Sequence, residues 1–593
     1  MLGLRSRSRT AADRGLRFTT SPLLSPALPA WRSRCVMLVL GAMFLALALR
    51  AIWLQGMADD FLQRQGAARH VRHLDLPAER GRILDRHGVV LAASVPARAV
   101  AGNPRLLAAA APGQLEALAG LLGIDGQDLA RKLESRRDFV YLKRQVEPAV
   151  AAQALALGLP GLETRVEARR RYPYGELAAH LVGFTDIEDV GQEGMELAAQ
   201  ASLAGSGGSR RVLRDRLGRV VEDLGGSRAP RDGRDLVLAL DHRIQHVARA
   251  HLKTALETHQ ARAAGIVVLD VASGEVLALA NLPDYDPNAR ARLSGAQLRN
   301  RVLTDTFEPG SVIKPFTIAL ALESGLATPE TLVDTAPGRM RIGSATIGDA
   351  SRHGTLTVSQ VLEKSSNIGV AKLALQMPAE AMWTLLTEVG FGQAPALGFP
   401  GTAAGRLRPH RSWKPIEQAT IAYGHGMSTS LLQMAQSYLV FARDGEMVPV
   451  SLFRQDGPPP ARRVLSRQTA GAVRAMMEAA TGPGGTAPRA RVPGYRVAGK
   501  TSTAHKVVDG RYANRYVAGF VGLAPASAPR IVVAVMVDEP TVGGHYGGRV
   551  AAPVFANVTR DVMRLLNVSP DAPVDDILAP VDGAADADTV PPG

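Results

Sequence analysis

Residues 307–316 have the sequence "FEPGSVIKPF", in which Ser311 precedes Lys314 by three positions, behind a Pro-Gly pair and inside an apolar run. The chain has nine lysines, and Lys314 is the only one with a serine at this spacing. Pro309 and Gly310 interrupt the chain and helical apolar spacing follows, so Ser311 is expected at a helix N-terminus. Backbone N–H groups there favour a developing negative charge, and residues i and i+3 share one helix face.

This spacing predicts that the amine of Lys314 can reach the hydroxyl of Ser311. A serine hydroxyl is a weak nucleophile without a base, and a lysine can serve as one if burial and a neighbouring positive charge lower its pKa. The alternative is a helix-capping serine beside an unrelated surface lysine. The apolar neighbours of Lys314 argue against that alternative.

Two further segments carry side chains that suit the same chemistry. Ser365 and Asn367, in "VLEKSSNIGVAKLAL", offer a hydroxyl to a proton relay and an amide to a substrate carbonyl, although Ser-x-Asn by itself is typical of a helix cap. The segment "YRVAGKTSTAHK" is a predicted strand with a cation and hydroxyls at Lys500, Thr501, Ser502 and Thr503. Such a strand suits a substrate carboxylate and can pair with an extended peptide; the alternative is a plain surface strand.

The sequence also indicates which partners and cofactors to expect. The net charge is +14, almost wholly from arginine, which favours anionic partners, but no RNP, zinc-finger or helix-turn-helix motif is present, so we expect no nucleic acid. Cys35 is the only cysteine, which excludes an internal disulfide and a cysteine-based metal cluster. There is no His-Glu-x-x-His pattern, and we expect no metal and no cofactor.

Residues 35–49, "CVMLVLGAMFLALAL", predict a membrane-spanning helix that extends to residue 57, because about twenty residues of helix cross a bilayer. Seven arginines and one acid, Asp13, precede it. The positive-inside rule therefore predicts a cytoplasmic N-terminus and a periplasmic remainder. A cleaved signal peptide, with Ala46–Ala48 as the cleavage site, is the alternative.

The remaining pattern predicts an α+β fold. Residues 265–281 indicate a hairpin, and two more strands follow late in the chain, at "RYVAGFVGLAP" and "RIVVAVMVDEP". A long helical block lies between them, which favours an antiparallel sheet flanked by helices. Residues 78–94 predict a second hairpin, residues 203–211 a flexible loop, and residues 569–593 a disordered acidic tail.

Ser-x-x-Lys, Ser-x-Asn and Lys-Thr-x occur here in the order known from penicillin-binding proteins and serine β-lactamases. The chain resembles class B penicillin-binding proteins, specifically the division-type (FtsI-like, penicillin-binding protein 3) peptidoglycan D,D-transpeptidases. The resemblance runs from the membrane segment to about residue 566. It includes "RGRILDRHG", "RRYPYGELAAHLVGFTD", "GQEGMEL", "RDRLGRVVED", "DVASGEVLALANLPDYDPN", "RNRVLTDTFEPGS", "AYGHGMS" and "YGGRVAAPVF".

Composition and the resemblance together imply five regions along the chain, of which the pedestal and the transpeptidase domain rest on the resemblance. They are a basic cytoplasmic tail (1–34), a transmembrane helix (35–57), an elongated non-catalytic pedestal of the dimerisation type (58–230), a transpeptidase domain with the serine β-lactamase-like fold (231–568) and the acidic tail (569–593). The chain would then be a single-pass protein of the inner membrane.

The resemblance also implies a role for each candidate residue. Ser311 would attack the D-Ala-D-Ala bond of a stem peptide and would be the residue that β-lactams acylate, with Lys314 as its base. Ser365 would relay a proton and Asn367 would bind a substrate amide. The substrate carboxylate would be held by Lys500 and Thr501, and the backbone N–H groups of Ser311 and Thr503 would form an oxyanion hole.

One residue departs from the family pattern, which usually has glycine where this chain has Ser502. Glycine at that point lets the strand approach the substrate closely. Serine is small and can point away from the cleft, so we expect retained activity with altered β-lactam affinity. His425, in "AYGHG", is given no catalytic role.

Several alternatives stay open at this level. On the same fold the enzyme could be an elongation-type transpeptidase, a D,D-carboxypeptidase or a β-lactamase, although a β-lactamase needs neither anchor nor pedestal. A catalytically impaired, membrane-anchored divisome scaffold is another alternative. No glycosyltransferase motif precedes the pedestal, so a divisome glycan polymerase and other division proteins are the expected partners.

Overall fold

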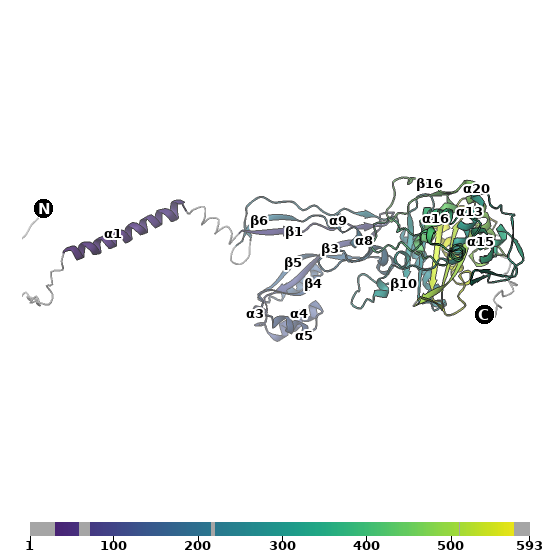
Figure 1. The fold of residues 1–593 in the computed structure, drawn as a ribbon. Coiled ribbons are helices and arrows are strands. Elements are labelled where there is room, and N and C mark those ends of the chain that lie inside the picture. Colours follow the sequence, from purple (N-terminus) through teal and green to yellow (C-terminus); the bar gives the residue numbers. More distant parts are fainter. Residues whose placement is uncertain (1–29, 58–70, 215–219, 509, 574–593) are drawn as a thin grey trace, which may run out of the picture. The chain divides into compact units, whose positions relative to one another are not determined.

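The computed structural model describes residues 30–57, 71–214, 220–508 and 510–573 (Figure 1). The chain packs as two compact units, Met1–Leu76 with Gly208–Ala229, and Pro77–Gly207 with Pro230–Gly593. These units are interleaved in the sequence, because strands from distant segments pair with each other. The regions predicted from the sequence are instead consecutive, with the pedestal at residues 58–230 and the transpeptidase domain at residues 231–568.

The first unit contains a long apolar helix and a small sheet. Helix α1 (Ala30–Ile52) continues into a π-helical turn, η2 (Trp53–Met57), and is long and apolar enough to cross a membrane. It begins at Ala30 rather than at the predicted Cys35, and the tail before it lies outside the described residues. An antiparallel sheet joins β1 (Val71–Leu76), β6 (Gly208–Arg214) and β7 (Val220–Asp223).

The loop predicted at residues 203–211 is therefore wrong in its second half. Residues 208–211 belong to β6, whose backbone pairs with β1 from Leu76↔Gly208 to Val71↔Leu213. The glycines and serines suggested a loop, but ladder hydrogen bonds to a distant strand outweigh their low β-propensity.

The second unit begins with a sheet of order β4-β3-β2-β8, with β5 also paired to β3. The strands are β2 (Ile83–Leu84), β3 (Val90–Gly102), β4 (Val140–Val146), β5 (Leu162–Arg171) and β8 (Leu236–Val237). Helices α3 (Pro104–Leu107), α4 (Pro112–Leu122), α5 (Gly126–Leu133) and α6 (Pro148–Ala156) enclose a separate small core. The hairpin predicted at residues 78–94 is formed by β2 and β3 around a turn at Asp85–Gly88.

A buried ionic group ties three parts of this region together. The carboxylate of Glu196, in α8 (Gly194–Ala198), accepts hydrogen bonds from Arg80 Nε at 2.7 Å and Arg170 Nε at 2.7 Å. All three residues are buried. Arg170 is the central residue of the arginine triplet at residues 169–171. The remaining short helices of this region are η3 (Gly175–Leu177), α7 (Ala179–Val182) and α9 (Gln200–Leu203).

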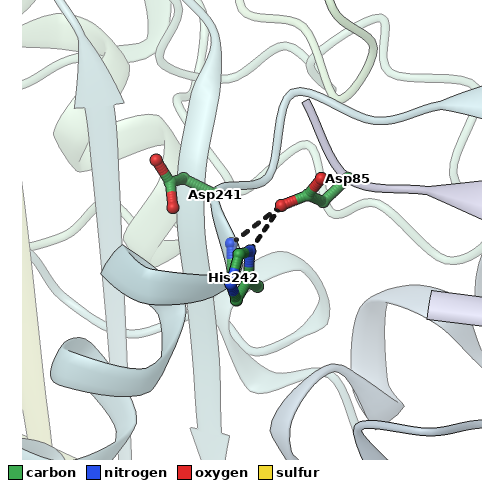
Figure 2. Close-up of side chains that lie close together, drawn as sticks. All are labelled: Asp85, Asp241 and His242. Carbon is green, nitrogen blue, oxygen red and sulfur yellow. Dashed lines mark hydrogen bonds and ion pairs between the residues drawn. The ribbon is translucent and has the colours of Figure 1, made fainter. Parts of the chain in front are cut away.

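A second junction surrounds the start of helix α10 (His242–Thr258). Figure 2 shows Asp85, Asp241 and His242 beside one another. Asp85, from the β2–β3 turn, lies 2.7 Å from His242 Nδ1 and also accepts the backbone N–H groups of His87 and Val89. Asp241 caps α10 through the N–H of Arg243 and lies 2.9 Å from His87 Nε2. These bonds join the hairpin to α10.

The main sheet is antiparallel, as the sequence predicts, and its strands follow the order β10-β9-β19-β18-β17. Its strands are β9 (Ala263–Asp270), β10 (Val276–Leu282), β17 (Ala498–Val508), β18 (Arg511–Ala524) and β19 (Ile531–Asp538). Every residue of β9 is buried, because both faces of the sheet are covered. Helices α10 and α22 (Ala552–Leu565) pack on one face and share a core with it.

The helical block covers the other face and holds the largest core. It contains α11 (Gly295–Leu298), α12 (Arg301–Thr304), η4 (Gly310–Ile313), α13 (Lys314–Glu323), α14 (Val358–Glu363), α15 (Asn367–Ala374), α16 (Ala379–Glu388), η5 (His410–Ser412), α17 (Pro415–Ile421), α18 (Leu431–Ser437), α19 (Leu439–Ala442) and α20 (Arg467–Thr481). Short strand pairs are β11 (Leu332–Asp334) with β14 (Thr355–Thr357), β12 (Arg339–Ile342) with β13 (Ala345–Gly348), and β15 (Glu446–Met447) with β16 (Arg462–Arg463). Near the end of the chain lie η6 (Pro488–Ala490) and α21 (Gly547–Val550).

The predicted disordered tail is described only at its beginning. The Asp571 carboxylate accepts hydrogen bonds from the backbone N–H of Arg496, at 2.8 Å, and from the hydroxyl of Ser527. The start of the tail is therefore held by the body of the protein. The rest of the predicted tail, from residue 574, lies outside the described residues.

Candidate functional site

The loop of residues 307–311, which we call the serine loop, brings Ser311 to the start of α13. Ser311 lies in η4, and Lys314 begins α13, so the predicted helix N-terminus is a 3-10 turn that passes into the helix. Phe307 pairs with Thr429 through two backbone hydrogen bonds of 3.0 and 2.9 Å. Below the loop, the hydroxyl of Tyr438 donates to the carbonyl of Val312 at 2.9 Å.

Gly424 also holds the serine loop in place, through its contact with Gly310. The N–H of Gly310 donates to the carbonyl of Gly424 at 3.2 Å. A Cβ atom on Gly424 would lie 2.2 Å from the carbonyl oxygen of Gly310, and its φ of +84° is in the region that favours glycine. Only glycine therefore allows the two backbones to approach this closely.

The hydroxyl of Ser365 is the centre of the site. It donates to Ser311 Oγ at 3.2 Å and accepts from Lys314 Nζ at 3.0 Å and Lys500 Nζ at 2.9 Å. Lys314 Nζ also donates to the backbone carbonyl of Ser365. The two amines predicted from distant segments thus meet at one hydroxyl, which itself contacts the candidate nucleophile.

The backbone of Ser365 is held in a strained conformation, with φ of +61°. Ser366 follows as the N-cap of α15 and donates its hydroxyl to Asp349 at 2.6 Å. Asp349 also accepts the N–H of Ile368 at 2.9 Å. This carboxylate, which the sequence analysis missed, holds the turn that presents Ser365.

Burial controls the charges of the two lysines. Lys314 is 1% exposed and Lys500 is fully buried. Burial and then the nearby charge of Lys500 hold the pKa of Lys314 well below its usual range, whereas Asp349 opposes that shift. Burial lowers the pKa of Lys500 to about 7. Lys314 is therefore suited to be a neutral base, while Lys500 can still carry charge near neutral pH.

The other candidates on β17 surround this centre. Thr501 Oγ1 lies 3.4 Å from Lys500 Nζ and donates to the hydroxyl of Thr486 at 3.3 Å. Thr503 accepts the N–H of Gly547 at 3.0 Å. Asn367 is not bonded to Ser311; its amide donates to the carbonyl of Gly348 at 2.8 Å.

Ser502 is buried, and its side chain turns toward the serine loop. Its hydroxyl donates to the carbonyl of Pro309 at 2.5 Å. A Cβ atom on Gly310 would lie 2.8 Å from the same hydroxyl. The residue that departs from the family pattern therefore connects β17 to the loop that carries Ser311.

One further group of side chains beside the serine loop was missed from the sequence. Glu308 accepts the N–H of Gly426 at 2.8 Å and the hydroxyl of Tyr512 at 3.2 Å. The ring of His425 lies between those of Tyr423 and Tyr512, at centroid distances of 5.1 and 6.2 Å. The position of Glu308 next to the Pro-Gly pair was the available signal.

Asp85, Asp241 and His242, far from this centre in the sequence, have potential ligand atoms within 4.8 Å of one another. Their partners within the chain account for that arrangement. Asp241 lies 2.6 Å from Arg243 Nη2 and 2.9 Å from His87 Nε2, and Asp85 lies 2.7 Å from His242 Nδ1.

Comparisons with known proteins cover nearly the whole chain. Residues 264–560 match the penicillin binding protein transpeptidase domain, and residues 75–238 match the penicillin-binding protein dimerisation domain. The probable peptidoglycan D,D-transpeptidase PenA of Neisseria meningitidis is 43% identical over 91% of this chain and 93% of its own. The peptidoglycan D,D-transpeptidase FtsI of Escherichia coli is 39% identical over 90% of this chain and 92% of its own.

Solved structures agree with these sequence relatives. The transpeptidase domain of penicillin-binding protein 3 from Burkholderia pseudomallei is 50% identical, covers 57% of this chain and 98% of that structure, and has a TM-score of 0.53. Penicillin-binding protein 3 of the tuberculosis mycobacterium, complexed with aztreonam, is 30% identical, covers 84% and 99%, and has a TM-score of 0.67.

Proposed function

Since this chain belongs to the class B penicillin-binding proteins, with a dimerisation domain before a transpeptidase domain, we propose that it is a peptidoglycan D,D-transpeptidase of the serine, acyl-enzyme type. Its donor is a stem peptide that ends in D-Ala-D-Ala. β-Lactams acylate the same serine as mimics of that donor.

The proposed reaction has two steps. Ser311 Oγ attacks the carbonyl carbon of the D-Ala-D-Ala peptide bond, Lys314 takes its proton, and Ser365 passes a proton to the leaving amine of the terminal D-alanine. The backbone N–H groups of Ser311 and Thr503 stabilise the oxyanion. The amine of a neighbouring stem peptide then attacks the ester, forming the cross-link and returning a proton to Ser311.

The remaining candidates bind the donor. Lys500 and Thr501 hold its terminal carboxylate, and Asn367 binds a substrate amide once it exchanges its bond to Gly348. The single observation that supports the mechanism best is the bonding of both lysine amines to Ser365 Oγ, which contacts Ser311 Oγ. Neither bond would be expected if Ser311 only capped a helix.

Labelling with a fluorescent penicillin tests the acylation step. We expect a covalent label on the full chain that Ser311→Ala abolishes, while Ser324→Ala, at the other end of α13, keeps it. Absence of a label on the wild-type protein would contradict the enzyme and favour a scaffold. Analysis of the products then separates a transferase, which forms cross-linked peptide, from a D,D-carboxypeptidase, which releases shortened stem peptide.

The cellular setting is part of the same proposal. We place the N-terminus in the cytoplasm and residues 58–230 (pedestal) and 231–568 (catalytic domain) in the periplasm, because seven arginines precede the apolar helix. The likeness to FtsI supports service at the division septum, with a glycan polymerase of the divisome as partner. A fluorescent fusion should concentrate at midcell; uniform sidewall signal would instead support an elongation enzyme.

A further inference from the structure

A cavity of about 240 Å³ lies at the far end of β17 from Lys500. Its lining includes Glu308 from the serine loop, Ser428 from the loop before α18, and His505 and Val507 from β17. Val517 of β18 and Met536 and Asp538 of β19 also line it. The cavity therefore borders the strand and the loop that carry the proposed chemistry, but none of the catalytic residues assigned above lines it.

The carboxylates that line this cavity differ in whether they have a cationic partner. Two of its carboxylates have cationic partners, since Asp305 lies 3.2 Å from Arg301 and Asp538 lies 2.8 Å from Lys506. Within the described ranges, Glu308 makes no ion pair. Its hydrogen-bond donors among these residues are both neutral: the N–H of Gly426 and the hydroxyl of Tyr512. A fixed, partly exposed carboxylate without a cation is complementary to a cationic ligand.

The direction of the donor along β17 indicates which part of it reaches this cavity. With the terminal carboxylate at Thr501, an extended donor paired with β17 runs toward His505, a distance of about 13 Å at the rise of a strand. That length spans the two terminal D-alanines and the residue before them. The side chain of that third residue is thus the part of the donor that lies near Glu308.

The chemistry of cross-linking supplies the matching charge. A cross-link forms when an amino group of one stem peptide attacks the acyl group of another, so stem peptides carry a primary amine. Donor and acceptor are units of the same polymer, and the donor therefore carries the same amine, protonated near neutral pH.

We propose that Glu308, fixed by Tyr512 and the N–H of Gly426, binds the ammonium group on the third residue of the donor stem peptide. This inference rests on the function proposed above and adds a determinant of donor specificity to it. The ring of Tyr512 lies between those of His425 and His505, at centroid distances of 6.2 and 6.1 Å, and offers the ammonium an aromatic face beside the carboxylate.

Two thioester donors that differ only at this amine test the proposal on the full chain in detergent. One is Nα-acetyl-Lys-D-Ala-D-thiolactate, which keeps a free side-chain amine, and the other has that amine acetylated as well. We expect the wild-type kcat/KM for acylation to favour the free amine by roughly tenfold, the effect of one charge-assisted hydrogen bond. In Glu308→Gln this ratio should fall to about one, and in Tyr512→Phe to an intermediate value.

Glu539→Gln is the matched control, because Glu539 lies outside the cavity lining and is ion-paired with Lys506 at 2.6 Å. It should keep the wild-type ratio. A wild-type ratio near one, or an unchanged ratio in Glu308→Gln, would overturn the inference. Thermal unfolding checks that each variant folds, and Tyr512→Phe carries the test if Glu308→Gln does not. Failure of the proposed function would be distinct, since then neither thioester nor penicillin would acylate wild-type Ser311.

Discussion

Ser502 illustrates how one residue can act on the serine loop. Its hydroxyl donates to the carbonyl of Pro309 and so restrains the serine loop. In Ser502→Gly we expect slower acylation by several β-lactams, by roughly fivefold, the kinetic equivalent of one hydrogen bond of about 1 kcal/mol. Rapid-quench or spectroscopic acylation rates measure the effect. Rates unchanged for all the β-lactams would show that Ser502 does not alter reactivity.

The pH dependence of acylation belongs to the two buried lysines. The pKa of Lys500 is about 7, so its ammonium group is present below that pH and is lost above it. For donors with a carboxylate, kcat/KM should therefore fall by about tenfold per pH unit above the pKa of Lys500. A donor whose carboxylate is esterified should lack this alkaline decline. Identical pH profiles for the two donors would show that Lys500 does not bind the donor carboxylate.

At the scale of elements, the serine loop lies against the segment before α18, where Gly310 meets Gly424. Gly424→Ala would place Cβ 2.2 Å from the carbonyl oxygen of Gly310 and push the loop away. We expect acylation of Ser311 to fall by about 100-fold, the typical cost of displacing a reacting group by 1 Å.

Gly325→Ala is the control for this effect, because Gly325 follows α13 with φ of +70° and has no atom within 4 Å of its Cβ position. It carries the same backbone strain without the clash. Penicillin labelling over time compares the two variants. Equal labelling rates would indicate that strain, and not contact with the serine loop, decides the outcome.

Element prediction from the sequence succeeded where the pattern was local. The hairpin of β9 and β10 and the strands β18 and β19 follow from runs of apolar residues and their turns. The prediction failed for β6, because the glycines and serines of residues 205–209 indicate a loop. Pairing with β1, more than 130 positions away, provides its hydrogen bonds, and no local pattern reveals that partner.

At the scale of the whole molecule, the feature expected to affect the free energy of unfolding most clearly is the buried ionic group of Glu196, Arg80 and Arg170. Glu196→Gln leaves two buried guanidinium groups without an anion, and we expect the free energy of unfolding to fall by about 3–5 kcal/mol. Chemical denaturation of the full chain measures it. Glu163→Gln, in the exposed pair with Arg165, should change it by less than about 1 kcal/mol. Similar losses in both variants would contradict the role of burial.

Much of the site could be predicted from the chain itself. Spacing along a helix predicts that Ser311 and Lys314 share one face. The roles of Ser365 and Lys500 follow from the order of the three motifs, which resembles that of penicillin-binding proteins. The apolar helix near the N-terminus follows from composition in the same way.

Only the tertiary structure determined how these pieces act together. It brings Lys314 and Lys500 to the hydroxyl of Ser365 and buries both amines, which lowers their pKa values. It also turns Ser502 toward Pro309, and among the described residues it gives Glu308 no ion-pair partner. The physical reason is that burial, charge proximity and hydrogen-bond partners depend on distances in space between segments, which the order of residues does not specify.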